Sequence, residues 1–247
     1  MAPEPSAERR RTSFGTEIPA EAYDQHRPSY PADAVHYALG APRTKLKVLD
    51  LGAGTGKLSR VIAESGHNVL AVDPNAAMLA QLDGDPVSTV VGTAEAIPVN
   101  DSSVDAVVMG QAWHWVDPEQ AVREIDRVLK PGGVLSLLWN IRDGNEPWVV
   151  ELMDAGVRTP GDPSKSPWVE WPTMSPPFTR RERQWFSNDW PIPATGLVAL
   201  MATWSHVRLD RRRDEWMKVA ADIQRRHAAP DGSLVLPHFC RVFRYKH

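Results

Sequence analysis

Cysteine is almost absent from this sequence, because Cys240 is the single cysteine among 247 residues. One thiol excludes an intrachain disulfide, and it excludes zinc or iron–sulfur sites that need several cysteines. We therefore predict no metal site, and we expect a reducing, cytoplasmic compartment.

Long apolar runs and an excess of basic residues are also missing. No stretch of eighteen apolar residues is present, so we expect no membrane-spanning helix and no membrane partner. The 28 Lys and Arg residues stand against 31 Asp and Glu, which gives a net charge of −3. Such a balance provides no general basic field, so we expect no nucleic-acid partner. A hydrophobic content of 42% is enough for a real core, which excludes disorder of the whole chain.

Short apolar runs alternate with helical patterns in the first two thirds of the chain. Amphipathic helices separating strands that are apolar on both faces predict a parallel sheet covered on both sides. Right-handed crossovers make a doubly wound α/β sheet the expected topology. The expected strands are 47–51, 68–72, 87–91, 104–109 and 134–139.

The helix before the fifth expected strand has clear end signals. Asp117 and Pro118 are typical of a cap and a first turn, and we expect Pro131–Gly133 to end the helix. In the second half we expect helices at 197–204 and 215–226. We expect strands at 184–187 and 233–244, the latter bent at Pro237.

A glycine-rich turn follows the first expected strand directly. It reads Asp50-Leu51-Gly52-Ala53-Gly54-Thr55-Gly56 and leads into a helix. Glycines let a backbone approach a ligand closely, and the helix start offers free N–H groups. The spacing is G-x-G-x-G, and Lys57 stands where a dinucleotide fingerprint has its last glycine, which argues against a nicotinamide oxidoreductase. A P-loop is excluded because no G-K-[ST] follows.

Asp73 ends the second expected strand, 17 residues after Gly56. An ionised carboxylate only accepts hydrogen bonds, so Asp73 could take both hydroxyls of a ribose. The alternative is that Asp73 caps a helix whose first residue is Pro74.

These motifs together resemble the class I S-adenosylmethionine-dependent methyltransferases of the type-11 kind. The resemblance covers about residues 46–140 and includes Thr93–Pro98, Asp101–Asp105 and Pro131–Gly133. It implies a Rossmann-like seven-stranded sheet with the last strand antiparallel and helices on both faces. It also implies S-adenosyl-L-methionine as the cofactor. The cofactor-binding residues it implies are Tyr23, Arg27, Asp50, Gly52, Ala53, Gly54, Asp73, Pro74, Met78, Thr93, Ala94, Glu95, Gln111 and Ala112. For Glu95, a solvated loop carboxylate is the alternative.

Tyr23, Arg27-Pro28 and Tyr30-Pro31 resemble a segment that closes over cofactor and substrate in one subgroup of this family. An arginine beside tyrosines could clamp a carboxylate with its planar fork. The alternative is ordinary docking of an N-terminal helix.

Trp113-His114-Trp115 follows the fourth expected strand and is similar to a segment of small-molecule methyltransferases related to trans-aconitate methyltransferase. The two tryptophans could wall a pocket, and His114 could accept a proton as the catalytic residue. The alternative is that all three side chains simply pack the loop. Thr203–His206 resembles a further pocket-facing stretch. The expected substrate-binding residues are Tyr30, Trp113, His114, Trp115 and Trp204.

We therefore expect a methyltransferase that acts on a small molecule at an oxygen, either a carboxylate or a hydroxyl. Carbon methylation of a quinone-like acceptor and non-catalytic cofactor binding are the alternatives. The sequence indicates no oligomeric state. We expect 1–13 to be a flexible arm and 14–247 a single domain. Within it we expect an N-terminal helical cap (14–45), a cofactor-binding core (46–140) and a lid with C-terminal strands (141–247).

Overall fold

The computed structural model describes residues 20–156, 172, 174–178, 180–194, 196–204, 207 and 211–246. The expected arm at 1–13 lies outside these residues. The chain divides into two compact units, each assembled from three stretches. The sheet unit comprises Ser29–Ile141, Trp171–Asn188 and Phe239–His247, and the helical unit comprises Met1–Pro28, Arg142–Glu170 and Asp189–His238.

The sheet unit is built on a seven-stranded sheet of order β3-β2-β1-β4-β5-β9-β6. Neighbouring strands from β3 to β5 pair in parallel, and β9 pairs antiparallel with β6. This confirms the expected doubly wound sheet with the last strand antiparallel. The strands are β1 (Lys47–Leu51), β2 (Asn68–Asp73), β3 (Val87–Val91), β4 (Val104–Gly110), β5 (Leu129–Arg142), β6 (Arg180–Ser187) and β9 (His238–Lys246).

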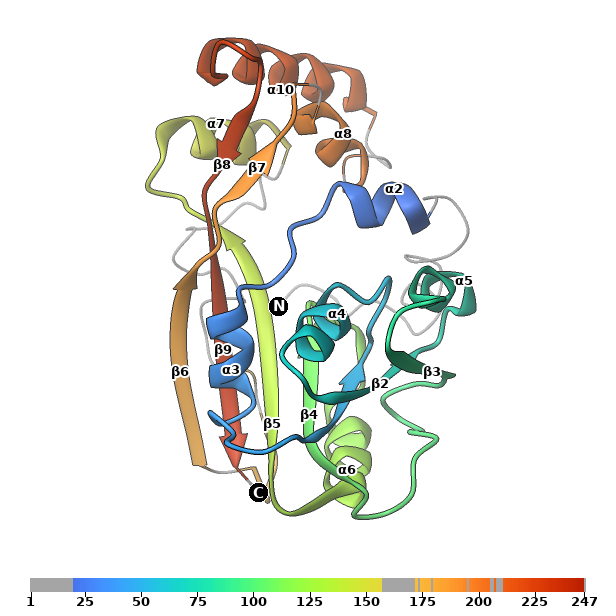
Figure 1. Cartoon of the computed structure of the whole chain (residues 1–247). Coiled ribbons are helices and arrows are strands. Elements are labelled where there is room, and N and C mark those ends of the chain that lie inside the picture. Colours follow the sequence, from blue (N-terminus) through green and yellow to red (C-terminus); the bar gives the residue numbers. More distant parts are fainter. Residues whose placement is uncertain are drawn as a thin grey trace. The chain divides into compact units, whose positions relative to one another are not determined.

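Helices cover both faces of this sheet because alternate strand residues point to opposite sides. Val48 and Val108 pack with α3 (Ala32–Ala38) and α4 (Lys57–Glu64). Leu49 and Val107 pack with α6 (Pro118–Val128). Figure 1 shows α6 on the face of the sheet opposite α3 and α4. The short helix α5 (Ala76–Leu79) continues into the 3₁₀ turn η1 (Ala80–Leu82) beside β2.

The start of α6 confirms the expected cap, but its end differs from the prediction. Asp117 Oδ1 accepts hydrogen bonds from the backbone N–H groups of Glu119 and Gln120 at 3.0 and 3.1 Å. The helix ends at Val128, and Pro131–Gly133 lies inside β5 instead of ending the helix. The register explains this, because Val104 pairs with Leu129 whereas Ala106 already pairs with Val134. Residues 130–133, which lie between these two pairs, form an irregularity of the strand.

The helical unit contains a second core that is rich in tryptophan. Trp148, Trp204 and Trp216 are buried among aliphatic side chains of its helices and short strands. The elements are α2 (Ala20–Gln25), α7 (Pro147–Gly156), β7 (Trp190–Ile192), α8 (Gly196–Ala202), α10 (Arg213–His227) and β8 (Leu234–Leu236). Within the described residues, no helix combines the length and the hydropathy needed to cross a membrane.

Pro237 divides the expected strand at 233–244 into two strands with different partners. β8 pairs antiparallel with β7 in a two-stranded sheet, whereas β9 joins the large sheet. The expected single bent strand is therefore wrong. Because proline has no N–H to give to a ladder, it is suited to the point where one pairing ends and another begins.

Candidate active site

The glycine turn between β1 and α4 needs its glycines for different reasons. Gly52, Gly54 and Gly56 all have positive φ, at 74°, 56° and 85°. A Cβ at Gly52 would lie 2.6 Å from the Cβ of Ala112, and one at Gly56 would lie 2.2 Å from Leu82. A Cβ at Gly54 would meet nothing within 4 Å. Gly52 and Gly56 are thus required by packing, whereas Gly54 faces open space.

Asp73 ties the end of β2 to this turn. Its Oδ2 accepts a hydrogen bond from the N–H of Gly54 at 2.9 Å, and its Oδ1 accepts one from the N–H of Asn75 at 2.8 Å. Asn75 is the residue that caps α5, through N–H groups of Ala77 and Met78. The alternative of Asp73 as the cap, with Pro74 as the first helical residue, is therefore wrong. Burial raises the pKa of Asp73, and the two N–H donors oppose this shift.

Asp50 is a fully buried carboxyl at the end of β1. Its Oδ2 accepts a hydrogen bond from the hydroxyl of Ser59 at 2.6 Å, whereas its Oδ1 has no hydrogen-bond partner among the described residues. Burial, opposed by the hydrogen bonds from Ser59 and reinforced by the negative charge of Asp73, raises the pKa of Asp50 to about 7. Sequence reasoning missed Ser59. The available signal was a serine on the buried face of α4, three residues before Ile62.

The loop after β3 is held by backbone contacts to α6. Glu95 Oε1 accepts a hydrogen bond from the N–H of Asp117 at 2.9 Å, and Ala94 is buried. Glu95 is therefore not simply a solvated loop carboxylate. Thr93 forms an isolated bridge with Ala96.

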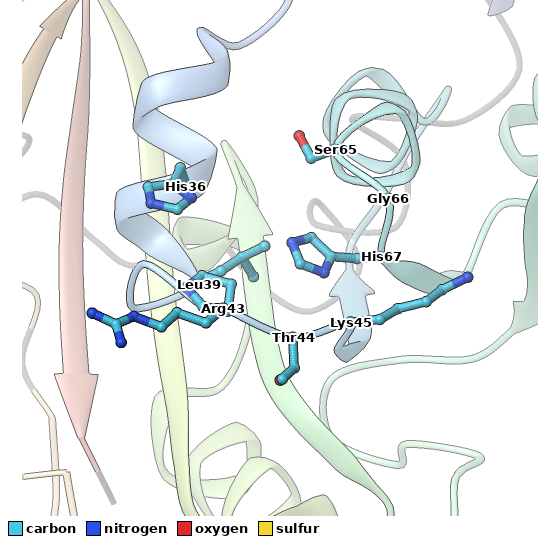
Figure 2. A pocket seen from close by; sticks show the side chains of 9 residues that line it. His36, Leu39, Arg43, Thr44, Lys45, Ser65, Gly66 and His67 are labelled. Carbon is cyan, nitrogen blue, oxygen red and sulfur yellow. The ribbon is translucent and has the colours of Figure 1, made fainter.

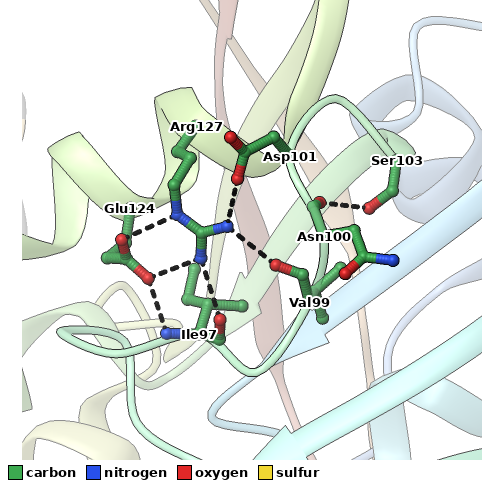
Figure 3. A network of polar contacts seen from close by, with 7 residues as sticks. All are labelled: Ile97, Val99, Asn100, Asp101, Ser103, Glu124 and Arg127. Atoms are coloured by element: carbon green, nitrogen blue, oxygen red, sulfur yellow. Dashed lines mark hydrogen bonds and ion pairs between the residues drawn. The ribbon is translucent and has the colours of Figure 1, made fainter.

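Arg127 fixes the next part of the same loop, as Figure 3 shows. Its guanidinium donates to the carbonyls of Ile97 and Val99 at 2.9 and 2.8 Å, and it pairs with Asp101 and Glu124 at 2.7 Å. The two carboxylates raise the pKa of Arg127, and the arginine lowers that of Glu124. The loop that carries residues 93–95 is thus anchored on α6.

The loop after β4 brings the predicted aromatic segment to the carboxyl end of the sheet. Gln111 has a φ of 57°, and it donates to the carbonyls of Leu138 and Asn140 at 2.9 Å through its N–H and side-chain amide. Trp113–Trp115 forms the 3₁₀ turn η2. Trp113 is 7% exposed and belongs to the core cluster, whereas Trp115 is half-buried.

His114 lies 4.7 Å from the ring of Trp115, measured between ring centroids. Burial lowers the pKa of His114 to about 4, so the imidazole is neutral at pH 7. It can accept a proton, but it is a weak base.

Tyr30 lies over the last residue of β4. A Cβ at Gly110 would be 2.5 Å from the hydroxyl of Tyr30, so only glycine leaves room for this ring. The preceding carbonyl, of Ser29, accepts hydrogen bonds from the amides of Asn140 and Asn188 at 3.0 and 2.8 Å. Sequence reasoning did not identify these two asparagines, because they lie more than a hundred residues away.

The comparisons with known proteins agree on one family. A family model described as a methyltransferase domain matches residues 49–137. An uncharacterized methyltransferase of Mycobacterium tuberculosis is 45% identical over 192 residues, which cover 76% of this chain and 75% of the relative. A solved structure of a candidate type II methyltransferase from Anaeromyxobacter dehalogenans has the same fold, with 24% identity, a TM-score of 0.61 and coverage of 89% and 97%. The chain belongs to the class I S-adenosylmethionine-dependent methyltransferases.

Two shorter matches have named activities. The methyltransferase is 35% identical over 127 residues to a malonyl-[acyl-carrier protein] O-methyltransferase of Pectobacterium atrosepticum. This match covers 50% of the chain and 49% of the relative. It is 43% identical over 109 residues to a ubiquinone/menaquinone biosynthesis C-methyltransferase of Hahella chejuensis, with coverage of 39% and 43%.

The methyltransferase uses S-adenosylmethionine, and the carboxyl edge of its sheet fits this cofactor. The buried Oδ1 of Asp50 has no hydrogen-bond partner in the described part of the chain, which suits the positively charged ammonium of an amino acid. The open space at Gly54 lets a ligand approach the backbone.

Other predicted residues of the methyltransferase lie in the helical unit. Arg27 donates to the hydroxyl and the carbonyl of Thr203, both at 3.1 Å, and Trp204 is buried at 2% exposure. Tyr23 belongs to α2, but its side chain is outside the described residues, as are Ser205 and His206.

A surface pocket of the methyltransferase is lined by His36, Arg43, Lys45 and His67 among others and has a volume of about 240 Å³ (Figure 2). Its residues come from segments that precede β1 and β2, so it lies at the amino ends of these strands. The glycine turn follows the carboxyl end of β1, and this pocket is therefore separate from the cofactor residues. In the described ranges, no three His, Cys, Asp or Glu side chains gather to hold a metal ion.

Proposed function

We propose that this methyltransferase transfers the methyl group of S-adenosylmethionine to an oxygen of a small-molecule acceptor, and that a carboxylate is favoured over a hydroxyl. The observation that carries the proposal is that His114 is a neutral, weakly basic imidazole. Burial lowers its pKa to about 4, whereas a general base works best with a pKa near the working pH. A carboxylate is already ionised and needs no base. A phenol or a carbon acid does need one.

The reaction balances without a proton transfer. S-adenosylmethionine supplies a methyl group that is already activated by its bond to a sulfonium. A carboxylate oxygen would form a bond to the methyl carbon as the C–S bond breaks, and the electron pair of the C–S bond would stay on the sulfur, which becomes a neutral thioether. The protein mainly has to align the acceptor with that bond, and alignment alone can contribute about 7–11 kcal/mol.

The cofactor residues of the proposal lie on loops at the carboxyl ends of β1 to β4. Asp50 takes the ammonium group, and the backbone of Gly52–Gly54 borders the methionine part. Asp73 accepts from the ribose hydroxyls, which its remaining lone pairs allow beside the two N–H donors. The remaining contacts, with the nucleoside or the methionine part, come from Pro74, Met78, Thr93, Ala94, Glu95, Gln111 and Ala112. Tyr23 stays a prediction from the sequence.

The acceptor residues of the proposal are Tyr30, His114 and Trp115, which follow or overlie the end of β4. Neutral His114 orients the acceptor oxygen instead of removing a proton. Trp113 is almost wholly buried in the core of the sheet unit, which supports a role in shaping the loop after β4 rather than broad contact with the acceptor. Trp204 is buried in the core of the helical unit, and its contact with the acceptor stays a prediction from the sequence.

Alkali treatment of methyl-labelled products distinguishes methyl esters from other products and so tests the proposal. The protein is incubated with a metabolite extract and methyl-labelled S-adenosylmethionine, and labelled products are identified by mass spectrometry. Mild alkali releases labelled methanol from a methyl ester, whereas a methyl ether or a C-methyl group keeps its label. The Asp73→Ala variant serves as the control for background transfer. Labelled product that survives alkali would overturn the carboxylate assignment.

Carbon methylation is the second candidate, supported by the match to a C-methyltransferase. Alkali-stable label on carbon, located by fragmentation of the product, would favour it. Tight binding of S-adenosylhomocysteine in calorimetry without any labelled product would favour non-catalytic cofactor binding. Binding of NAD in place of S-adenosylhomocysteine would contradict every one of these functions.

A further inference from the structure

Two arginines meet one short segment of the helical unit. Arg27 donates to Thr203 through Nε and Nη2, both at 3.1 Å, and the Thr203 hydroxyl in turn donates to the carbonyl of Leu200 at 2.6 Å. Arg142 lies over the ring of the next residue, Trp204, with its guanidinium carbon 3.8 Å from the ring centroid. The two guanidiniums are thus fixed on neighbouring residues.

Arg142 is a cation in a setting that disfavours its charge. Its Nε is buried and has no hydrogen-bond partner among the described residues, and none of the described carboxylates forms an ion pair with it. Burial, and after it the positive charge of Arg27, lowers the pKa of Arg142 to about 9. Asp143, the adjacent carboxylate, is engaged locally by Asn145 at 2.9 and 2.8 Å. A buried charge without a partner is costly unless a ligand supplies one.

The surroundings of His238 are a second indication that Arg27 and Arg142 lie close to the same region of the helical unit. The N–H of Asp143 donates to the carbonyl of Pro237 at 2.9 Å, which holds the residue after Arg142 beside the residue before His238. Burial, together with the positive charges of Arg142 and Arg27 and opposed by the hydrogen bond to Leu236, lowers the pKa of His238 to about 4. Its Nδ1 is 2.9 Å from the carbonyl of Leu236, which can only accept, so Nδ1 carries the proton of a neutral ring.

We infer that Arg27 and Arg142 form an anion-binding site of the helical unit whose ligand is a carboxylate. All the residues that build it belong to this one unit. The ring of Trp204 holds the fork of Arg142 in a plane, which suits a planar ligand with two oxygens. The site is inferred for the helical unit alone, and it does not depend on the proposed function.

Direct binding tests the site without any methyl transfer. The probes are sodium hexanoate and sodium benzoate, compared with sodium chloride and inorganic phosphate at constant ionic strength. Binding is followed by the ring signals of His238 in NMR spectra, assigned with the His238→Gln variant. A carboxylate between the arginines offsets the charges that act on His238, so its pKa rises when hexanoate or benzoate is added, and chloride leaves it unchanged.

Substitutions of Arg142 test whether the carboxylate binds at this residue. Arg142→Met keeps much of the stacking volume on Trp204 but removes the charge, so carboxylate affinity should fall by about 10- to 100-fold. Arg142→Lys keeps the charge without the planar fork and should recover only part of the affinity. Arg212→Met is the matched control, because Arg212 also lies over a tryptophan, with its guanidinium 5.4 Å from the ring of Trp216.

The outcomes separate this inference from the proposed function. Absence of a carboxylate effect on His238 in the wild-type protein would overturn the site, and this measurement needs no variant to fold. Unchanged affinity in folded Arg142→Met, or a stronger effect of phosphate than of carboxylates, would also overturn it. Calorimetry with S-adenosylhomocysteine is run on the same samples. Carboxylate binding in a protein that forms only alkali-stable products would keep the site and reject the proposed acceptor.

Discussion

The cofactor residues of the sheet unit and the arginines of the helical unit are held by contacts of different range along the chain. Among the cofactor residues of the sheet unit, contacts join residues close in sequence, such as Asp50 with Ser59 and Gly54 with Asp73. In the helical unit, Arg27 reaches Thr203 across 176 residues, and Arg142 lies against Trp204. The cofactor residues can therefore be found from local sequence patterns, whereas the surroundings of Arg27 and Arg142 depend on contacts between distant segments.

The largest effect is expected from Asp73→Ala on the cofactor side. The change removes the acceptor of the Gly54 and Asn75 N–H groups and the proposed ribose contact. We expect a loss of about 3 kcal/mol, or roughly 100-fold, in affinity for S-adenosylhomocysteine by calorimetry. Asp73→Asn keeps one acceptor oxygen and should lose less. Near-normal binding in the alanine variant would show that Asp73 only shapes the turn.

Asp50 should make the stability of the cofactor-free protein depend on pH. Burial raises its pKa from 3.8 to about 7, so the folded protein binds a proton that the unfolded chain releases. Its contribution is fully present below pH 3.8 and is lost as the pH rises through 7, by an amount of the order of a few kcal/mol. Urea unfolding at pH 5 and pH 7.5 measures this loss. Asp50→Asn should reduce the difference, and an equal difference in that variant would contradict the assignment.

Gly54→Ala and Gly66→Ala form a matched pair. Both glycines have positive φ, at 56° and 89°, and a Cβ at either would meet nothing within 4 Å. Each variant should therefore lose about 1 kcal/mol of unfolding free energy in urea. Only Gly54→Ala should also weaken S-adenosylhomocysteine binding, by about tenfold, because only its Cβ occupies the space proposed for the cofactor. Equal affinities in the two variants would remove Gly54 from the cofactor site.

The smallest effect is expected from His114→Gln on the acceptor side. If the acceptor is a carboxylate, no proton is removed, and kcat should fall by less than about tenfold. The pH profile of kcat should show no ionisation near pH 4 that disappears in the variant. A fall of several hundredfold together with such an ionisation would make His114 a base and favour a hydroxyl or carbon acceptor.

Much of the sheet unit could be predicted because its signals are local. β1 and β3 have the predicted bounds, and Asp117 caps α6 as expected. Predictions failed where tertiary pairing decided the outcome. Leu129 continues into β5 because it pairs with Val104, and Pro237 separates two strands because β7 is available as a partner for β8.

The residues of the candidate site also fall into those that local spacing predicts and those that only tertiary contacts bring together. The glycine turn and Asp73 could be found from their spacing, although the pairing of Asp73 with Asn75 and Gly54 could not. No spacing rule points to Arg142, because its environment is created by Thr203, Trp204 and His238. Of the elements in the helical unit, α8 and α10 overlap the predicted helices at 197–204 and 215–226, whereas α7 and β7 carry weaker periodic signals and were not predicted.

The interleaving of the two units has a consequence for how such a protein can diversify. The chain passes from one unit to the other between residues 28 and 29, 141 and 142, 170 and 171, 188 and 189, and 238 and 239. No single cut can therefore detach the helical unit, and no single insertion can replace it with another. A change in the carboxylate bound at the inferred site would have to arise by substitutions within the unit, at positions such as Arg142, and would leave the sequence of the glycine turn unchanged.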